Sequence, residues 1–264
     1  MTNFRHSSFR LRPSCLGISS LAVIALCALV AWPLAGWAKD KDKEKQSAGE
    51  VVDSGSFGVY RAGQRVATET FSIHSGSDGS VVSSEFKSEQ GEQKAAQSSE
   101  LLLTPSVELR RYVWKETLPE KNEATVEPSE TFLIEHFDAA PGEKQQEQSF
   151  LLPASTTILD DYFFIQREVL AWKFLATACR KEKDGLHCPP NQKVQFGTLD
   201  PHMRSSMAVS VEFSGEEKLT IHGSERGLTR FVLRSENGDW TFWLDGQFKL
   251  VRLLADGGTE VLRD

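Results

Sequence analysis

Three glycine-containing turn sequences in the last third of this 264-residue chain restrict its fold more than any other feature. They are Asn237-Gly238, Asp245-Gly246 and Asp256-Gly257-Gly258. Each lies between short segments rich in β-branched and aromatic residues, and Asn-Gly and Asp-Gly pairs favour the tight turns of β-hairpins. The last third of the chain is therefore predicted to be an antiparallel meander.

The amino-terminal half has the same character. An opening hairpin is predicted around Gly63, because glycine adopts the positive φ of a tight turn without steric cost. Further turns and polar loops separate short segments of alternating polarity, which is typical of strands. Strands are predicted at residues 57–60, 66–73, 81–86, 98–103, 107–116, 131–137, 193–198, 206–213, 218–222, 228–234, 240–244, 248–254 and 260–263.

Two of these strands, at residues 107–116 and 131–137, are apolar on both sides. Their opposing faces carry Val107, Leu109 and Val113 against Tyr112 and Trp114 in the first, and Phe132 and Ile134 against Leu133 and Phe137 in the second. A strand that is apolar on both faces needs cover on both. A second layer is therefore predicted beside the sheet.

Residues 159–178 are predicted to form the helix that supplies this layer. Apolar and aromatic residues recur in it at helical spacing. Thr157 and Asp160 resemble a capping box at its start, and the adjacent carboxylates of Asp160 and Asp161 suit the positive end of a helix dipole. Trp172, toward the far end of the apolar stripe, is expected to be buried against residues 107–116 or 206–213.

These elements predict a mainly β fold: a single antiparallel curved sheet or partly open barrel packed around one α-helix. Residues 51–264 contain no fixed-period repeat and no composition break, so one domain is expected. Residues 39–50 are charged and lack apolar periodicity, which predicts a flexible linker.

The first 38 residues are interpreted as a signal peptide. Arg5, Arg10 and Arg12 precede an apolar stretch, and small residues at Gly36 and Ala38 form a cleavage site. Cleavage after Ala38 would leave a periplasmic or secreted protein whose only link to the membrane is the export signal. The alternative is an uncleaved anchor, because residues 16–38 are long enough to span a bilayer.

The predicted mature chain keeps two of the four cysteines, Cys179 and Cys188, and these are expected to form a disulfide in an oxidising compartment. It also carries 27 Lys and Arg against 37 Asp and Glu, a net charge of −10. An acidic domain repels phosphate backbones, so nucleic acid is not expected as a partner.

Residue patterns for catalysis are absent from the sequence. It contains no nucleophile elbow, no paired histidines at metal-binding spacing and no phosphate-binding glycine loop. No catalytic residue, metal or cofactor is therefore predicted. Glu69 shares a strand face with Phe71 and Ile73, so it needs either a cationic partner such as Arg61 or Arg65, or a raised pKa.

The opening hairpin carries a family resemblance through Gly58-Val59-Tyr60, Gly63, Glu69 and Phe71, and residues 243–251 carry another. Both resemble exported bacterial all-β proteins of unknown function, and more loosely the periplasmic carriers of lipoproteins. The resemblance implies an antiparallel sheet folded as an open half-barrel around a helix. It implies no catalytic residues.

Three functions are compatible with these features. The first is a non-enzymatic envelope protein, carrier-like or chaperone-like, that binds a lipid or other apolar ligand or segment in a groove of the curved sheet. The second is an assembly protein that pairs with an envelope protein partner, and the third is a hydrolase with an unrecognised site. The residues expected to line a groove are Phe71, Ile73, Leu109, Val113, Phe132, Ile134, Phe163, Trp172, Val209 and Val211.

Overall fold

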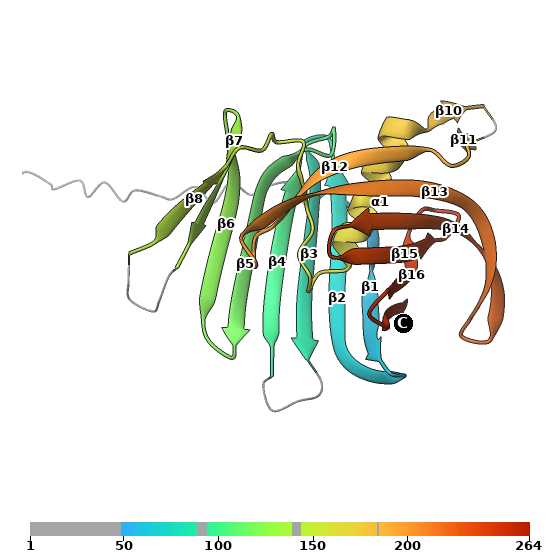
Figure 1. Ribbon diagram of the computed structural model, residues 1–264, viewed down its shortest axis with the longest axis horizontal. Helices are drawn as coiled ribbons and strands as arrows, with labels where there is room; N and C mark the ends of the chain where they lie inside the picture. The colour runs from blue at the N-terminus through green and yellow to red at the C-terminus, as the bar shows by residue number, and fades with distance from the viewer. Residues whose placement is uncertain (1–48, 89–93, 139–143, 184) are drawn as a thin grey trace, which may run out of the picture. The chain divides into compact units, whose positions relative to one another are not determined.

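The computed structural model describes residues 49–264, apart from 89–93, 139–143 and 184 (Figure 1). This part of the chain contains one 15-stranded sheet, one two-stranded sheet and one α-helix. The large sheet is curved and is not closed, so the predicted mainly β fold class is confirmed. The predicted signal peptide, and all but the last two residues of the predicted linker, lie outside the described residues.

The first eight strands form a meander in which each strand pairs antiparallel with the next. The predicted opening hairpin is present, and Ala62 and Gly63 adopt φ angles of 48° and 76° in its turn. The strands are β1 (Glu50–Arg61), β2 (Gln64–Gly76), β3 (Gly79–Ser88), β4 (Ala96–Leu103), β5 (Leu109–Leu118), β6 (Asn122–Ser129), β7 (Phe132–Phe137) and β8 (Gln146–Phe150).

The second half of the chain continues the same sheet, and the three predicted glycine turns connect its last four strands. The predicted strands at residues 206–213 and 218–222 are one long strand, with an irregularity between Phe213 and Gly215. The strands are β9 (Thr157–Ile158), β12 (Lys193–Asp200), β13 (Ser205–Ile221), β14 (Ser224–Ser235), β15 (Gly238–Leu244), β16 (Leu250–Ala255) and β17 (Thr259–Arg263).

The two halves join where β1 pairs antiparallel with β17. Phe57 lies opposite Arg263 in this pairing. The Arg263 guanidinium also donates to both carboxylate oxygens of Asp53, at 2.6 and 2.9 Å. Asp53 is 3% exposed, so this buried ion pair links β1 to β17 where the two halves meet.

The helix α1 (Ile165–Ala178) lies between the first strands and the last strands of the sheet (Figure 1). Glu69 of β2 accepts hydrogen bonds from its first amides, and its own Glu168 accepts one from the backbone amide of Leu250 in β16, at 2.6 Å. Residues that are fully buried at and near the helix are Phe163, Ile165, Leu170 and Phe174. The helix therefore fills the hollow of the sheet with core side chains.

The start of the helix differs from the prediction, since α1 begins six residues after residue 159. Thr157 belongs to β9, and no side chain within this segment caps the helix. Trp172 is half-buried and its indole N–H donates to the carbonyl of Phe248, at 2.8 Å. Trp172 therefore lies beside the connection between β15 and β16, which was not expected.

The predicted faces of two strands need correction. The pairing of β5 is irregular near Leu109, so Leu109, Tyr112 and Trp114 all join the core, whereas Val113 lies outside this cluster, next to outward-facing charged residues. On β7, Leu133 is fully buried but Phe132 is 40% exposed. The strand β7 is thus buried at Leu133 on one face and exposed at Phe132 on the other.

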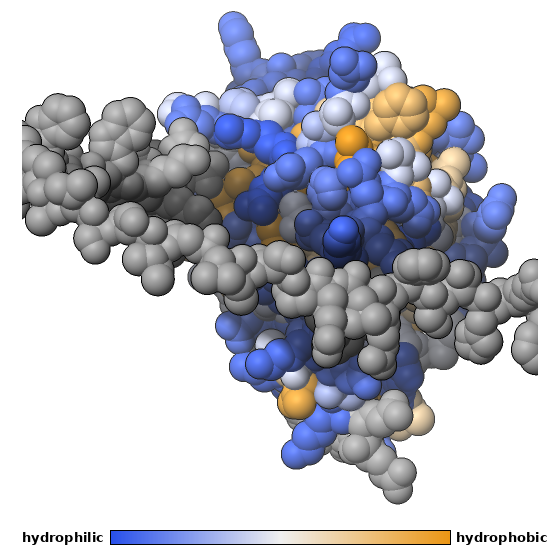
Figure 2. Space-filling model, turned by 90° about the vertical axis from the view of Figure 1, so that its left-hand side faces the viewer, coloured by the Kyte–Doolittle hydropathy of each residue, from blue (hydrophilic) through white to orange (hydrophobic). Residues whose placement is uncertain are grey.

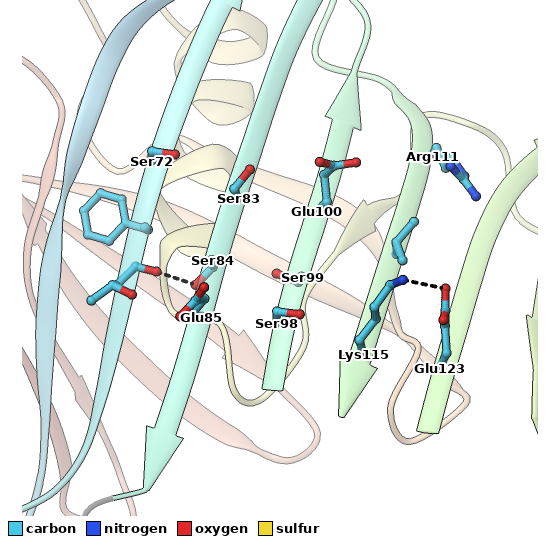
Figure 3. Close-up of a pocket in the computed structure, with 13 residues that line it drawn as sticks. Ser72, Ser83, Ser84, Glu85, Ser98, Ser99, Glu100, Arg111, Lys115 and Glu123 are labelled. Carbon is cyan, nitrogen blue, oxygen red and sulfur yellow. Dashed lines mark hydrogen bonds and ion pairs between the residues drawn. The ribbon is translucent and has the colours of Figure 1, made fainter. Parts of the chain in front are cut away.

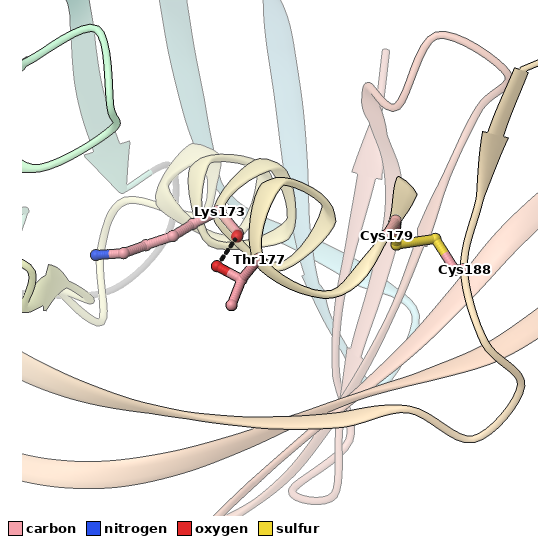
Figure 4. The surroundings of a disulfide bond; sticks show 4 residues. All are labelled: Lys173, Thr177, Cys179 and Cys188. Carbon is pink, nitrogen blue, oxygen red and sulfur yellow. Dashed lines mark hydrogen bonds between the residues drawn. A yellow bond between two sulfur atoms is a disulfide. The ribbon is translucent and has the colours of Figure 1, made fainter. Parts of the chain in front are cut away.

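The predicted disulfide between Cys179 and Cys188 is present, with Cα atoms 4.3 Å apart (Figure 4). It follows directly after α1 and encloses a small hairpin of β10 (Arg180–Glu182) and β11 (Gly185–His187). No helix in the described part of the chain has the length and apolarity needed to cross a membrane. The face seen in Figure 2 is largely hydrophilic, with small separate groups of hydrophobic residues.

Candidate functional site

The segment that leads into α1 is organised around the Asp160 carboxylate, which is fully buried. Its Oδ2 accepts a hydrogen bond from the Tyr112 hydroxyl at 3.1 Å, and its Oδ1 accepts one from the amide of Tyr162 at 2.9 Å. Burial, and to a lesser degree the nearby Asp200 carboxylate, raises the pKa of Asp160 from 3.8 to about 7. Asp160 is therefore a structural centre of this turn and not a residue of the first helical turn, as had been predicted.

Glu69 of β2 caps α1 from across the hollow. Its Oε2 accepts from the amide of Phe164 at 2.8 Å, and its Oε1 accepts from the amide of Ile165 at 3.3 Å and from the Ser84 hydroxyl at 2.7 Å. Burial raises the pKa of Glu69 from 4.5 to about 7, although these hydrogen bonds lower it. Of the two predicted cationic partners, Arg65 pairs instead with Asp264, at 2.9 Å.

The guanidinium of Arg167 lies beneath this turn and is 4% exposed. Its Nη1 donates to the carbonyls of Asp160 and Phe163, at 2.5 and 3.1 Å. Four carboxylates interact with its charge, those of Asp160, Asp161, Glu69 and Asp200. One cation therefore faces four acids at the start of the helix.

A pocket of about 520 Å³ opens beside this turn. Two lining rings, Tyr162 and Phe86, meet edge to face with centroids 5.2 Å apart. On its other side Tyr162 stacks on His202, at 4.9 Å. We call it the aromatic pocket and define it by Phe86, Tyr162, Phe164, Trp240, Asp161 and Asp200.

Apolar side chains form part of the aromatic pocket where it meets the sheet. Val59, Val66 and Ala67 of β1 and β2 form this part of its wall. A smaller pocket of about 160 Å³ shares Asp161, Asp200 and Trp240 with it and reaches Arg167. An apolar cavity with a few convergent polar groups is typical of a small-molecule binding site.

A second hollow, of about 610 Å³, lies on the outer face of β2–β6 (Figure 3). Figure 3 shows serine hydroxyls and charged side chains along this groove, with α1 behind the strands. Two of its charges are paired, since Lys115 Nζ lies 3.2 Å from a Glu123 oxygen. Arg111 also pairs, with Glu127 at 2.9 Å. Charged side chains that are already paired and solvent-exposed contribute little to ligand binding. The aromatic pocket is therefore the stronger candidate.

The ten residues predicted to line a groove do not lie around one cavity. Phe132 is exposed and Ile134 and Trp172 are half-buried. Phe71 and Val113 line the outer groove, Val209 lines the smaller pocket beside Arg167, and none of the ten lines the aromatic pocket. The buried members of the core cluster are Phe71, Ile73, Leu109, Phe163, Val209 and Val211. Their assignment as ligand contacts stays a prediction.

The aromatic pocket was not predicted from the sequence. Asp161, Tyr162 and Phe164 belong to a segment predicted to be helical, whereas Phe86, Asp200 and Trp240 come from β3, β12 and β15. The run Asp160-Asp161-Tyr162-Phe163-Phe164 was the available signal, because two adjacent acids before three aromatic residues fit a helix poorly on one face. Among the described residues, no three His, Cys, Asp or Glu side chains gather in a metal-binding arrangement.

Two solved structures are similar to this chain. A beta-barrel-like protein of the domain of unknown function DUF1849 from Brucella abortus is 10% identical, and the alignment covers 83% of this chain and 97% of that one, with a TM-score of 0.54. A DUF1089 family protein from Pseudomonas aeruginosa is 8% identical over 73% and 90% of the two chains, with a TM-score of 0.43. No family model and no curated protein matches the sequence. The first similarity supports the expected likeness to all-β proteins of unknown function, at the level of fold alone.

Proposed function

We propose that this is an exported, non-enzymatic envelope protein that binds an apolar or amphiphilic molecule in the aromatic pocket. The observation that carries the proposal is the pocket of about 520 Å³, whose wall includes a set of apolar and aromatic side chains. The hollow of the sheet is filled by α1, so a ligand binds beside the start of the helix and not beneath it. Lipids are the first class of ligand to test.

Two features support export. The first 38 residues have the charge, apolar and cleavage-site pattern of a signal peptide. The two cysteines beyond them form a disulfide, and disulfides persist mainly in oxidising compartments. We therefore place the mature protein in the periplasm or outside the cell, after cleavage behind Ala38.

Organic extraction of the purified protein, followed by mass spectrometry, tests for a bound lipid. A second measurement uses the neutral fluorescent probe N-phenyl-1-naphthylamine with the substitution Trp240→Ala. Trp240 is half-buried in the pocket wall, so its loss should weaken probe binding by roughly three- to tenfold.

Trp243→Ala is the matched control on the same strand. The Trp243 side chain belongs to a separate small cluster, and its indole N–H donates to Glu217 at 2.8 Å. Probe binding by this variant should stay close to that of the parent. A folded Trp240→Ala protein that binds the probe as well as the parent does would contradict the proposed site.

A second candidate function, assembly with an envelope protein, is favoured by the edge of the sheet. The strand β8 is the last in the sheet order, and among the described residues it pairs with β7 alone. Leu151, directly after it, is 76% exposed. An edge strand with an exposed apolar residue directly after it is suited to strand addition by a partner. A photo-crosslinking residue at Leu151 should then capture a defined protein that the same residue at Leu254 does not.

A further inference from the structure

Acidic side chains outnumber cationic ones around the aromatic pocket in the described part of the chain. Besides Arg167, the turn at the start of α1 brings together Glu69, Asp160, Asp161 and Asp200. Three of these acids are buried, since Glu69 and Asp160 are fully buried and Asp200 is 8% exposed. A buried charge needs a partner of opposite sign or a proton. A cationic ligand would supply that partner.

Asp200 is the acid that a ligand can reach from the pocket. Its side chain lines the cavity, and its Oδ1 accepts a hydrogen bond from the amide of Met203 at 3.0 Å. Within the described residues no donor reaches its Oδ2. Burial, followed by the Asp161 charge, raises the pKa of Asp200. An approaching cation would therefore find, on the pocket wall, an Asp200 carboxyl oxygen that no described donor contacts, with the Asp161 charge nearby.

The aromatic walls suit a cation as well. Ring faces attract positive charge, and cages of such rings bind alkylated ammonium groups. Arg167 already uses this property on the core side, because its guanidinium carbon lies 5.1 Å from the Trp240 ring and 5.7 Å from the Phe164 ring. Tyr162 and Phe86 add two further rings on the pocket side.

An anionic head group is disfavoured at the same place. The free amides at a helix start are the usual anion site, but Glu69 already occupies those of Phe164 and Ile165. The other cationic group on the wall is Arg61, which is exposed at the rim, while His202 is stacked on Tyr162. An anionic head group would approach the carboxyl groups of Asp161 and Asp200 on the same wall.

We propose that the aromatic pocket binds the cationic head group of an amphiphile, an ammonium group that carries apolar substituents, with Asp200 and Asp161 as its counter-charges and Phe86, Tyr162 and Trp240 around it. This inference rests on the proposed function and specifies its ligand class. The apolar chain of the ligand lies along Val59, Val66 and Ala67 of the same wall.

Calorimetric titration with two probes of equal chain length tests the inference. They are decyltrimethylammonium and decanoate, each used below its micelle-forming concentration at low salt. The cation should bind at least about tenfold more tightly than the anion. Asp200→Asn keeps an oxygen acceptor for the Met203 amide but removes the charge, so it should weaken binding of the cation by roughly fivefold or more and leave decanoate unchanged or slightly stronger.

Two further variants make the result decisive. Asp161→Asn alters a side chain that is 70% exposed, which keeps the test valid if Asp200→Asn fails to fold. Asp245→Asn is the matched control, because Asp245 also accepts backbone hydrogen bonds in a turn, from Gln247 and Lys249, but lies outside the pocket. Asp161→Asn should weaken binding of decyltrimethylammonium severalfold, whereas Asp245→Asn should leave it unchanged.

The outcomes separate the two claims. If both probes bind equally well, and neither Asp161→Asn nor Asp200→Asn changes their ratio, the cationic head group is refuted while ligand binding stands. Tighter binding of decanoate refutes it in the same way. If neither probe binds and no lipid is extracted from the protein, the proposed function itself fails.

Discussion

The substitution Glu69→Gln tests whether the buried cap of α1 holds a proton in the folded protein. The folded domain keeps the proton on Glu69 up to about pH 7, whereas an exposed glutamate loses it near pH 4.5. As the pH rises between these values, the unfolded chain releases its proton first. The contribution of Glu69 to the free energy of unfolding should therefore be largest below pH 4.5, decrease through this window, and be lost above about pH 7.

The size of the effect follows from the pKa. A rise from 4.5 to about 7 corresponds to about 3 kcal/mol, at about 1.4 kcal/mol for each pKa unit, and about 2 to 3 kcal/mol of this falls between pH 5 and pH 8. Glutamine does not titrate, and its amide nitrogen cannot accept the hydrogen bond of one helix amide, which costs about 1 to 3 kcal/mol at every pH. Glu69→Gln should thus be about 2 to 3 kcal/mol more destabilising at pH 5 than at pH 8.

Urea unfolding followed by tryptophan fluorescence at the two pH values measures this difference. Comparing variant with parent cancels the other buried acids, such as Asp160 and Glu135, whose pKa values are also raised by burial and which change stability in the same direction. Glu85→Gln, an exposed substitution on β3, is the control, and it should change the free energy of unfolding by the same amount at pH 5 and at pH 8. If Glu69→Gln costs the same at pH 5 and pH 8, to within about 0.5 kcal/mol, the carboxylate is ionised in the fold and the reasoning is wrong.

Three further predictions concern the rest of the chain. Replacing both Cys179 and Cys188 by serine should lower the free energy of unfolding by about 2 to 3 kcal/mol without preventing folding, since the loop is short; urea unfolding measures it, and two free thiols in unreduced protein would contradict the bond. Phe174→Ala should cost about 3 to 5 kcal/mol and Trp172→Ala less, because Phe174 is fully buried and Trp172 is half-buried; equal costs by the same assay would contradict this. Intact mass spectrometry of protein recovered from the periplasm or medium should show a chain that begins at Lys39, and a mass that includes Met1 would exclude cleavage.

Local signals predicted much of the fold. The turns at Gly63 and Gly238 were identifiable because each needs a positive φ, with observed values of 76° and 118°. The disulfide followed from the number and spacing of the cysteines beyond the predicted signal peptide. Such features depend on neighbouring residues, so they can be predicted without knowledge of distant contacts.

The candidate site could not be predicted in this way, because its determinants come from distant parts of the chain. The helix begins at Ile165, where Glu69, 96 positions earlier, accepts its first hydrogen bonds. A capping box is a pattern of residues within one helical turn, so it does not identify a capping residue from a distant strand. The predicted face of Val113 was also wrong. One irregularity near Leu109 reverses, for the residues that follow it on β5, which side chains face the core.

The pairing of β1 with β17 has a consequence for how the domain is assembled. Asp53 and Arg263 are 210 positions apart, whereas the hairpins on either side of them close over a few residues. Contacts of such separation form late, because the entropy of closing a long loop has to be overcome first. Until then β1 has one unpaired edge that another chain can occupy. Closure within one molecule then competes with pairing between molecules, so the yield of refolded monomer should decrease as the protein concentration during refolding increases.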